Sequence, residues 1–240
     1  MIGRIVLAAL IAGMAAGLIY GGVQHVRTTP LIIAAEVFET AEPAAHDHTV
    51  AASDTTTAVA AAHEHEEEEW APADGWPRTL STSLASIVAG AGFALLLAGV
   101  SLLTGIPITP QNGLIWGICG FFALTVAPAA GLPPELPGMP AGDLVSRQVW
   151  WVGTIIATGA GIFLIATKRE ILWLVAAVVI IALPHIIGAP QPVSHETTVP
   201  AGLAASFAAN TIAASAVLWC LIGLFLGLAI QKFGKDAYAS

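Results

Sequence analysis

Six unbroken apolar stretches restrict the possible folds of this chain more than any other feature of its sequence. In lipid, only helices and closed barrels satisfy every backbone hydrogen bond, and these continuous runs lack the alternating pattern of barrel strands. Each run is close to the roughly 20 residues that an α-helix needs to cross about 30 Å of hydrocarbon. The sequence therefore predicts an all-α integral membrane protein, a bundle of about six transmembrane helices in one polytopic domain over residues 1–240. The apolar stretches are residues 4–23, 79–103, 112–130, 149–167, 171–188 and 201–231.

The composition agrees with a membrane protein and excludes nucleic acid as a partner. The chain is 56% hydrophobic and only 10% charged, unlike soluble globular domains. Its formal net charge of −8 is local, because eleven of its sixteen Asp and Glu residues fall between Glu36 and Asp74. The sequence has no basic patch that could neutralise phosphates. Cys119 and Cys220 lie in separate apolar stretches, so we expect no disulfide.

Lys and Arg residues near the span ends predict the orientation of the chain. An even number of spans puts both termini on one side of the membrane, and the side richer in Lys and Arg is cytoplasmic. We therefore expect cytoplasmic termini, with three outward segments, 24–78, 131–148 and 189–200. We also expect the first span to be retained, because no signal-peptide cleavage site follows it. The expected cytoplasmic side has Arg4, Lys168, Arg169, Lys232 and Lys235, and the opposite side has Arg27, Arg78 and Arg147.

The first outward segment holds two His-x-His pairs, in "HDH" (46–48) and "HEHEEEE" (63–69). Its middle, about 41–69, lacks hydrophobic periodicity and is predicted to be a disordered loop. Neutral imidazoles suit borderline first-row metals, and the neighbouring carboxylates add oxygen ligands and a negative field. The loop is therefore predicted to collect divalent cations, and the alternative is a merely solvated acidic linker. Its candidate metal ligands are His46, His48, His63 and His65.

Two proline-rich segments on the same predicted side hold further ionisable residues. In "IIALPHIIGAPQP", Pro184 is expected to break the helix directly before His185. Broken helices with freed carbonyls recur at transporter ion sites, although His185 could equally be an interfacial residue after a harmless kink. "GLPPELPG" holds Glu135, which is either a functional anion or a solvated turn residue. Glu135, His185 and the nearby His195 complete the predicted metal-binding residues.

Small and polar residues within the apolar stretches predict how helices pack. Asn210 in the last stretch is expected to donate a hydrogen bond between helices. Asp143 and Arg147, four residues apart, could form an ion pair at a helix start. Residues 28–40, "TTPLIIAAEVFET", are expected to lie along the membrane surface or to pack on the bundle. Glycines spaced four residues apart allow close helix contacts; they are Gly13, Gly17 and Gly21 in the first stretch and Gly223 and Gly227 in the last.

Enzyme signatures give no competing interpretation. "HEHEE" lacks the H-E-x-x-H spacing of zinc proteases, and the chain has no G-x-x-x-x-G-K-[ST] phosphate loop. We therefore expect neither an enzyme nor a bound cofactor, and any step driven by ATP would need another subunit.

Three segments together resemble one protein family. They are "APAAGLPPELPGMPAGDLVSRQVWW" (127–151), "LPHIIGAP" (183–190) and the His/Glu loop after "AEVFE" (35–39). They are similar to the CbtA family of proposed cobalt transporter subunits, which is associated with cobalamin supply. The resemblance implies a polytopic protein of the bacterial inner membrane and a small, single-span, His-rich companion subunit of the CbtB type. It leaves a homo-oligomer possible.

The sequence thus predicts uptake of a divalent first-row metal ion, with cobalt as the cargo that the resemblance implies. The outward loop would collect the ion, and the bundle would select it. Alternatives are a nickel or zinc transporter, and a metal-sensing or assembly protein that binds cations without moving them. The candidate entry residues are His25, Glu36, Glu39, Glu135, Asp143, His185 and His195.

Overall fold

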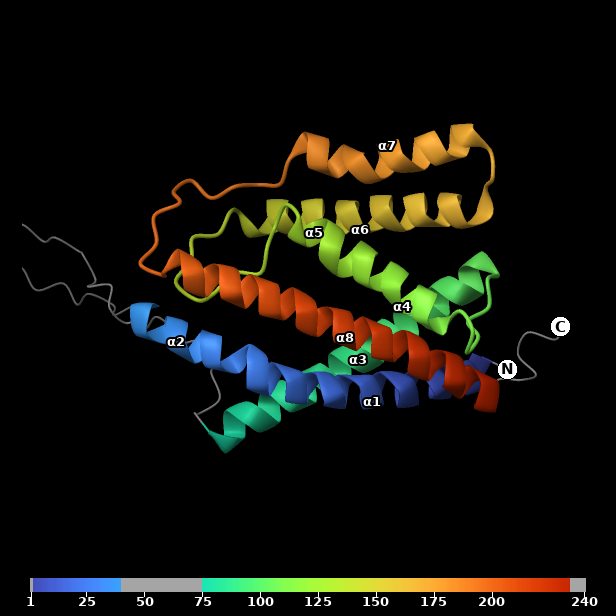
Figure 1. The fold of residues 1–240 in the computed structure, drawn as a ribbon, viewed down its shortest axis with the longest axis horizontal. Coiled ribbons are helices and arrows are strands. Elements are labelled where there is room, and N and C mark those ends of the chain that lie inside the picture. Colours follow the sequence, from blue (N-terminus) through green and yellow to red (C-terminus); the bar gives the residue numbers. More distant parts are fainter. Residues whose placement is uncertain (1, 40–74, 234–240) are drawn as a thin grey trace, which may run out of the picture.

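The computed structural model describes residues 2–39 and 75–233, and these residues form helices without any strand. The all-α class predicted from the sequence is confirmed. Figure 1 shows the helices lying roughly along the long axis of the molecule. In chain order they are α1 (Ile2–Arg27), α2 (Thr29–Glu39), α3 (Trp76–Thr104), α4 (Gly113–Phe121), the π-helix η1 (Phe122–Val126), α5 (Ala127–Ala129), α6 (Leu144–Thr167), α7 (Ile171–Ile187) and α8 (Ala201–Phe233).

Four of the described helices, α1, α3, α6 and α8, are long and apolar enough to cross a membrane. The chain is therefore a multi-pass membrane protein. The remaining two apolar stretches are also helical but shorter, Gly113–Ala129 and Ile171–Ile187. At 1.5 Å per residue, the 17-residue α7 is about 26 Å long, just short of the usual hydrocarbon thickness. The count of six spans stays a prediction.

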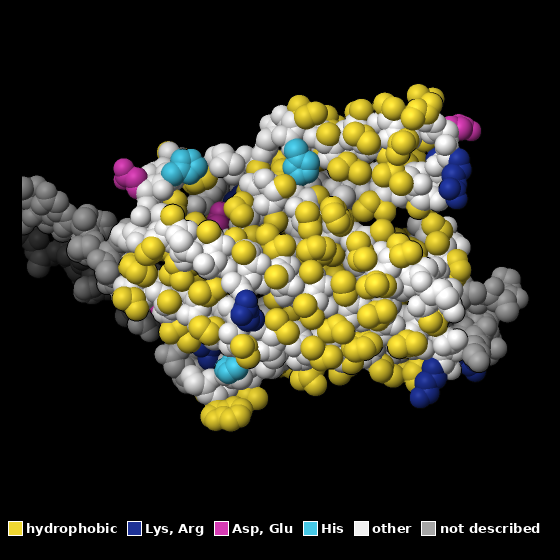
Figure 2. Space-filling view, viewed as in Figure 1, with side chains coloured by type: hydrophobic (Ala, Val, Ile, Leu, Met, Phe, Trp, Pro, Cys, Tyr) yellow, Lys and Arg dark blue, Asp and Glu magenta, His cyan; other side chains and the backbone are white. Residues whose placement is uncertain are grey.

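The bundle has two chemically different ends. At the terminal end lie the start of α1, the α6–α7 turn and the end of α8, and at the loop end lie α2 and the segments before α6 and after α7 (Figure 1). Hydrophobic side chains cover the middle of the face in Figure 2. The terminal end carries Arg4, Lys168, Arg169 and Lys232, so the structure groups these basic residues at one end, as the sequence predicts.

The glycine spacing predicts the helix contacts correctly. A Cβ atom on Gly13 would overlap the carbonyl of Gly90, and one on Gly17 would overlap the carbonyl of Ser86, so α1 lies backbone to backbone against α3. In α8, Gly223 is equally close to Gly113 of α4. These approaches are possible only because the residues lack a side chain. Around them, the main core gathers Trp219, Ile222 and Leu226 of α8 with Ile5 of α1 and Leu97 of α3.

Asn210 joins α1 and α8, but with the opposite polarity to the prediction. Its Oδ1 atom accepts a hydrogen bond from Arg27 Nε at 3.1 Å, and its Nδ2 group donates within α8 to the Ser206 carbonyl at 2.8 Å. Asn210 is the acceptor in the interhelical bond because the guanidinium of Arg27, at the end of α1, has only N–H donors.

Candidate functional site

Three separate segments meet at the loop end. Ala35 of α2, Leu136 before α6 and Val199 before α8 form a second buried cluster, together with Phe38 and Met139. The Thr198 hydroxyl also donates to the Phe38 carbonyl at 3.2 Å. The described part of the predicted segment 28–40, up to Phe38, therefore packs on the bundle. The packing fixes the segments that carry the predicted entry residues at one end of the molecule.

Glu135 is held in an ion pair. Arg147 Nη2 donates to Glu135 Oε2 at 2.7 Å, and the two side chains are only 24% and 26% exposed. The alternative that Glu135 is a solvated turn residue is therefore wrong. The prediction of a possible ion pair between Asp143 and Arg147 is wrong as well, because the Arg147 guanidinium pairs with Glu135.

Asp143 is the N-cap of α6. Its Oδ1 atom accepts bonds from the Ser146 amide at 2.9 Å and the Ser146 hydroxyl at 2.6 Å. These bonds to Ser146, the side-chain bond first, hold the pKa of Asp143 below its usual value of 3.8. A lowered folded-state pKa means that the cap stabilises α6 above the ordinary aspartate range and loses that effect as the pH falls through the folded value. Asp143 is thus engaged in starting a helix.

His185 lies against Trp150 of α6 instead of beside a helix break. α7 stays helical through Pro184 to Ile187 and ends at Gly188, whose φ of 90° needs glycine, so the break predicted at Pro184 is wrong. Pro184 sits in the last turn, where its missing N–H costs a single bond. Its carbonyl accepts the Trp150 indole N–H at 3.0 Å, and the Trp150 and His185 rings meet edge to face with centroids 5.8 Å apart.

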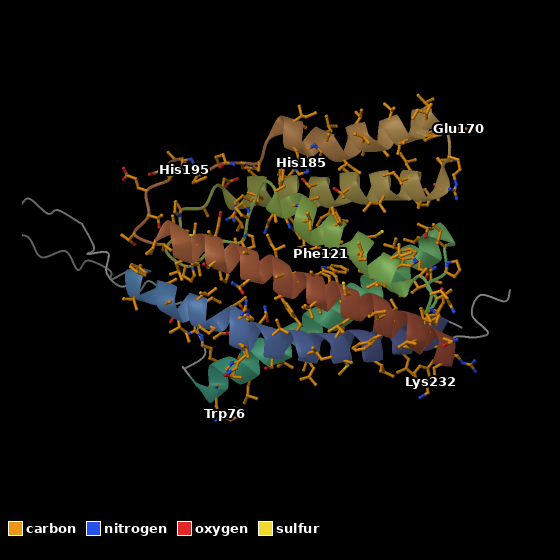
Figure 3. All side chains as sticks on the ribbon, in the orientation of Figure 1. Trp76, Phe121, Glu170, His185, His195 and Lys232 are labelled. Carbon is orange, nitrogen blue, oxygen red and sulfur yellow. The ribbon has the colours of Figure 1, made fainter. Side chains whose placement is uncertain are left out.

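The other predicted residues at this end are dispersed. His25 and His195 are exposed, and Figure 3 places His195 on the segment that follows α7. Glu36 forms an ion pair with Arg78 of α3. Within residues 2–39 and 75–233, no three side chains of His, Cys, Asp or Glu lie close enough to hold one metal ion. Glu135, His185 and His195 are therefore not gathered into one ligand set, and their metal-binding role stays a prediction.

Some predicted residues lie outside the part of the chain that the structure describes. This holds for the whole 41–69 loop and for the side chain of Glu39. Their assignment as metal ligands or entry residues remains a prediction. The loop ligands concerned are His46, His48, His63 and His65.

A partly open cavity of about 470 Å³ lies between helices of the bundle, and sequence reasoning missed it. Residues of α1, α3, η1 and α8 line it, and half of these residues are polar, so we call it the polar cavity. The Ser86 hydroxyl donates to Gln24 Oε1 at 2.7 Å, which joins α3 to α1 at the cavity. The one available signal was the spacing, because polar residues four apart share a helix face. The polar lining residues are Tyr20, Gln24, Thr82, Ser86, Thr125 and Ser215.

The cavity is bounded by a distorted helix and by stacked rings. Leu124 and Thr125 belong to the π-helix η1, and Trp219 donates its indole N–H to the Thr125 hydroxyl at 3.2 Å. The Phe93 and Trp219 rings lie 4.9 Å apart on its wall. A second, apolar cavity of about 460 Å³ lies between α3, α4 and α6 and shares Leu124 with the first.

Comparison with known proteins gives one positive result. The family model described as "Probable cobalt transporter subunit (CbtA)" matches residues 2–231, nearly the whole chain. Searches of curated proteins and of solved structures find no match.

Proposed function

The chain belongs to the CbtA family of probable cobalt transporter subunits, and from that premise we propose that it carries cobalt(II) across the bacterial inner membrane for cobalamin synthesis. The observation that carries the proposal is the extent of the family match, which includes every described helix apart from the last two residues of α8. A subunit has at least one partner. We propose that this partner is the small, single-span, His-rich protein that the sequence resemblance implies.

The proposed entry side is the loop end of the bundle. The imidazole and carboxylate loop begins and ends there, since residues 40–74 connect α2 with α3. The terminal end carries more Lys and Arg, which favours the cytoplasm. His46, His48, His63 and His65 would raise the local concentration of the ion, and the exposed His185 and His195 would receive it beside the paired Glu135.

A non-transporting role is the second candidate, and one observation favours it. Glu36 and Glu135 are already paired with arginines, and the described residues contain no three-ligand cluster. A sensor or assembly protein needs only the loop to bind metal. Uptake and sensing differ in one respect, because only uptake moves the ion to the cytoplasm.

Metal accumulation in cells tests the function and the choice of metal. Cells that express the chain together with its companion subunit should accumulate radioactive cobalt faster than cells in which the gene is deleted. Excess unlabelled cobalt should lower the uptake of radioactive cobalt more than the same concentration of nickel or zinc does. If nickel or zinc competes better than cobalt, the chain carries that metal instead, because ligand type alone does not set the choice among these ions.

The orientation can be measured with single cysteines in a background that lacks Cys119 and Cys220, which are both free thiols. A cysteine at Ala58 should react with a membrane-impermeant thiol reagent added outside intact cells. One at Ala237 should react only after the membrane is permeabilised. The reversed pattern would move the His/Glu loop to the cytoplasm and contradict its role as a collector.

Deleting residues 44–69 should raise the cobalt concentration needed for half-maximal uptake and leave the maximal rate nearly unchanged. The physical reason is that a collector increases the local ion concentration but does not form the pathway. The control is a loop of equal length in which the four histidines are replaced by serine, which should behave like the deletion. Complete loss of uptake in a correctly inserted deletion protein would show that the loop is part of the path.

A further inference from the structure

We propose that the polar cavity between α1, α3, η1 and α8 is a binding site for a monovalent alkali cation such as Na⁺. The binding site itself stands on the geometry of the cavity. Only its link to metal uptake, as the site of a coupling ion, rests on the proposed function.

The lining has the chemistry of a hard-cation site. The side chains of Gln24, Ser86, Thr125 and Ser215 present amide and hydroxyl oxygens, and Tyr20 adds a phenolic oxygen. Oxygen ligands suit hard cations, whereas first-row transition metals bind more strongly to the imidazoles and thiolates that this lining lacks among its described residues. The donor set therefore selects against the transition-metal cargo.

The charge of the cavity favours a monovalent ion over a divalent one. None of its described lining side chains carries a formal charge. Moving an ion from water into a low-dielectric interior is costly, and in the idealised case the cost grows with the square of the charge. Neutral oxygens can replace the hydration of a single charge, but a double charge would need a carboxylate partner.

The π-helix supplies a second, independent observation. η1 makes i→i+5 bonds, since the Ala127 amide donates to the Phe122 carbonyl, and such segments are rare and concentrated at functional sites. At membrane depth, irregular backbone is tolerated only where it is buried in protein or lines a water-filled cavity. Leu124 and Thr125 of η1 do line this one. Because Trp219 donates to the Thr125 oxygen, the Thr125 hydroxyl is held at the cavity wall.

The cavity is placed for access from the loop end. Tyr20 and Gln24 lie in the last two turns of α1, and Thr82 and Ser86 lie in the first three turns of α3. Both regions are nearer to α2 than to the termini (Figure 1). Further along α3 from that end, Phe93 packs on Trp219 and forms the aromatic wall of the cavity. An ion would enter from the side proposed for the metal and stop at this aromatic wall.

Direct binding of radioactive Na⁺ to the purified full-length chain in detergent, without any transition metal, tests the site. We expect saturable binding of about one ion per chain. Thr125→Val and Gln24→Leu should each weaken it by about tenfold, the effect of losing one good polar contact. Thr125→Ser keeps the oxygen and should retain binding, as should the control Thr167→Val, whose hydroxyl bonds only the Phe163 carbonyl of its own helix.

Each variant is compared with the wild type by size-exclusion chromatography and circular dichroism, so that loss of binding in a folded protein is separated from misfolding. Binding that is absent in the folded wild type, or equal in all four variants, would overturn the site. Cobalt entry measured with and without a Na⁺ gradient then tests the coupling alone. Saturable Na⁺ binding in a protein that moves no cobalt would leave the site standing and remove the proposed function.

Discussion

Gly90→Val should prevent the bundle from forming a stable protein, whereas Gly92→Val, two residues further along α3, should be tolerated. A Cβ atom on Gly90 would overlap the Gly13 carbonyl and lie 2.9 Å from both the Gly17 Cα and amide nitrogen, whereas one on Gly92 has nothing within 4 Å. The atoms that block Gly90 are backbone, so α1 and α3 must move apart along their whole contact. We expect a loss of about 3 kcal/mol or more, at the upper end of overpacking effects.

The pair of variants is matched in residue type, helix and change of helix propensity. The measurement is the fraction of each protein that stays monodisperse in mild detergent after a series of heating steps. Gly92→Val should melt within a few degrees of the wild type, and Gly90→Val should aggregate or elute as a broad peak. Equal behaviour of the two variants would contradict the close α1–α3 contact that the structure places at the centre of the bundle.

Arg147→Met should destabilise the folded protein by about 1–3 kcal/mol, because it leaves the half-buried Glu135 carboxylate without its partner. Glu135→Gln should cost less, since the amide oxygen can still accept a bond from Arg147. The double variant should lose less than the sum of the two single losses by about 1 kcal/mol, as expected for residues in direct contact. His185→Ala provides the comparison, because His185 packs on Trp150 and makes no bond to Glu135 or Arg147.

Chemical unfolding of the four variants in detergent provides the double-mutant cycle. The losses of Glu135→Gln and Arg147→Met should be coupled, whereas a Glu135→Gln/His185→Ala double variant should lose the sum of its two single losses. Glu135 and His185 each contact α6, Glu135 through Arg147 and His185 through Trp150. Additive losses for Glu135 and Arg147 would show that their ion pair contributes nothing in solution.

The helices were predictable because a helix that crosses a membrane requires a continuous run of apolar residues, which the sequence shows directly. The stretch predicted at 201–231 is the helix Ala201–Phe233, and the stretch at 171–188 is Ile171–Ile187. The apolar run alone places the start of α6 at residue 149, but the helix begins at Leu144, at the helix start that the sequence also suggests beside Asp143. Its start is set by the Asp143 N-cap, a polar signal that hydrophobic length does not register.

The candidate site was only partly predictable, for a different physical reason. The loop end could be inferred because successive spans cross the membrane in alternate directions, which puts the segments 24–78, 131–148 and 189–200 on the same side. The partner of Glu135 could not, since the sequence places three arginines, Arg27, Arg78 and Arg147, on the same predicted side, and only packing selects Arg147. The polar cavity left almost no signal in the sequence. Its polar lining comes from four elements, and each contributes only one or two neutral polar residues to an apolar run.

Entry of radioactive cobalt into sealed, right-side-out membrane vesicles tests the central claim most directly. Vesicles containing the chain and its companion should accumulate the isotope in a form that a brief wash with an impermeant chelator does not remove, and gentle lysis should release it. Vesicles carrying Gly90→Val should match those without the chain. Cobalt that is fully removed by the wash at every time point would show binding without transport, and the chain would then be a metal-binding subunit and not a route into the cell.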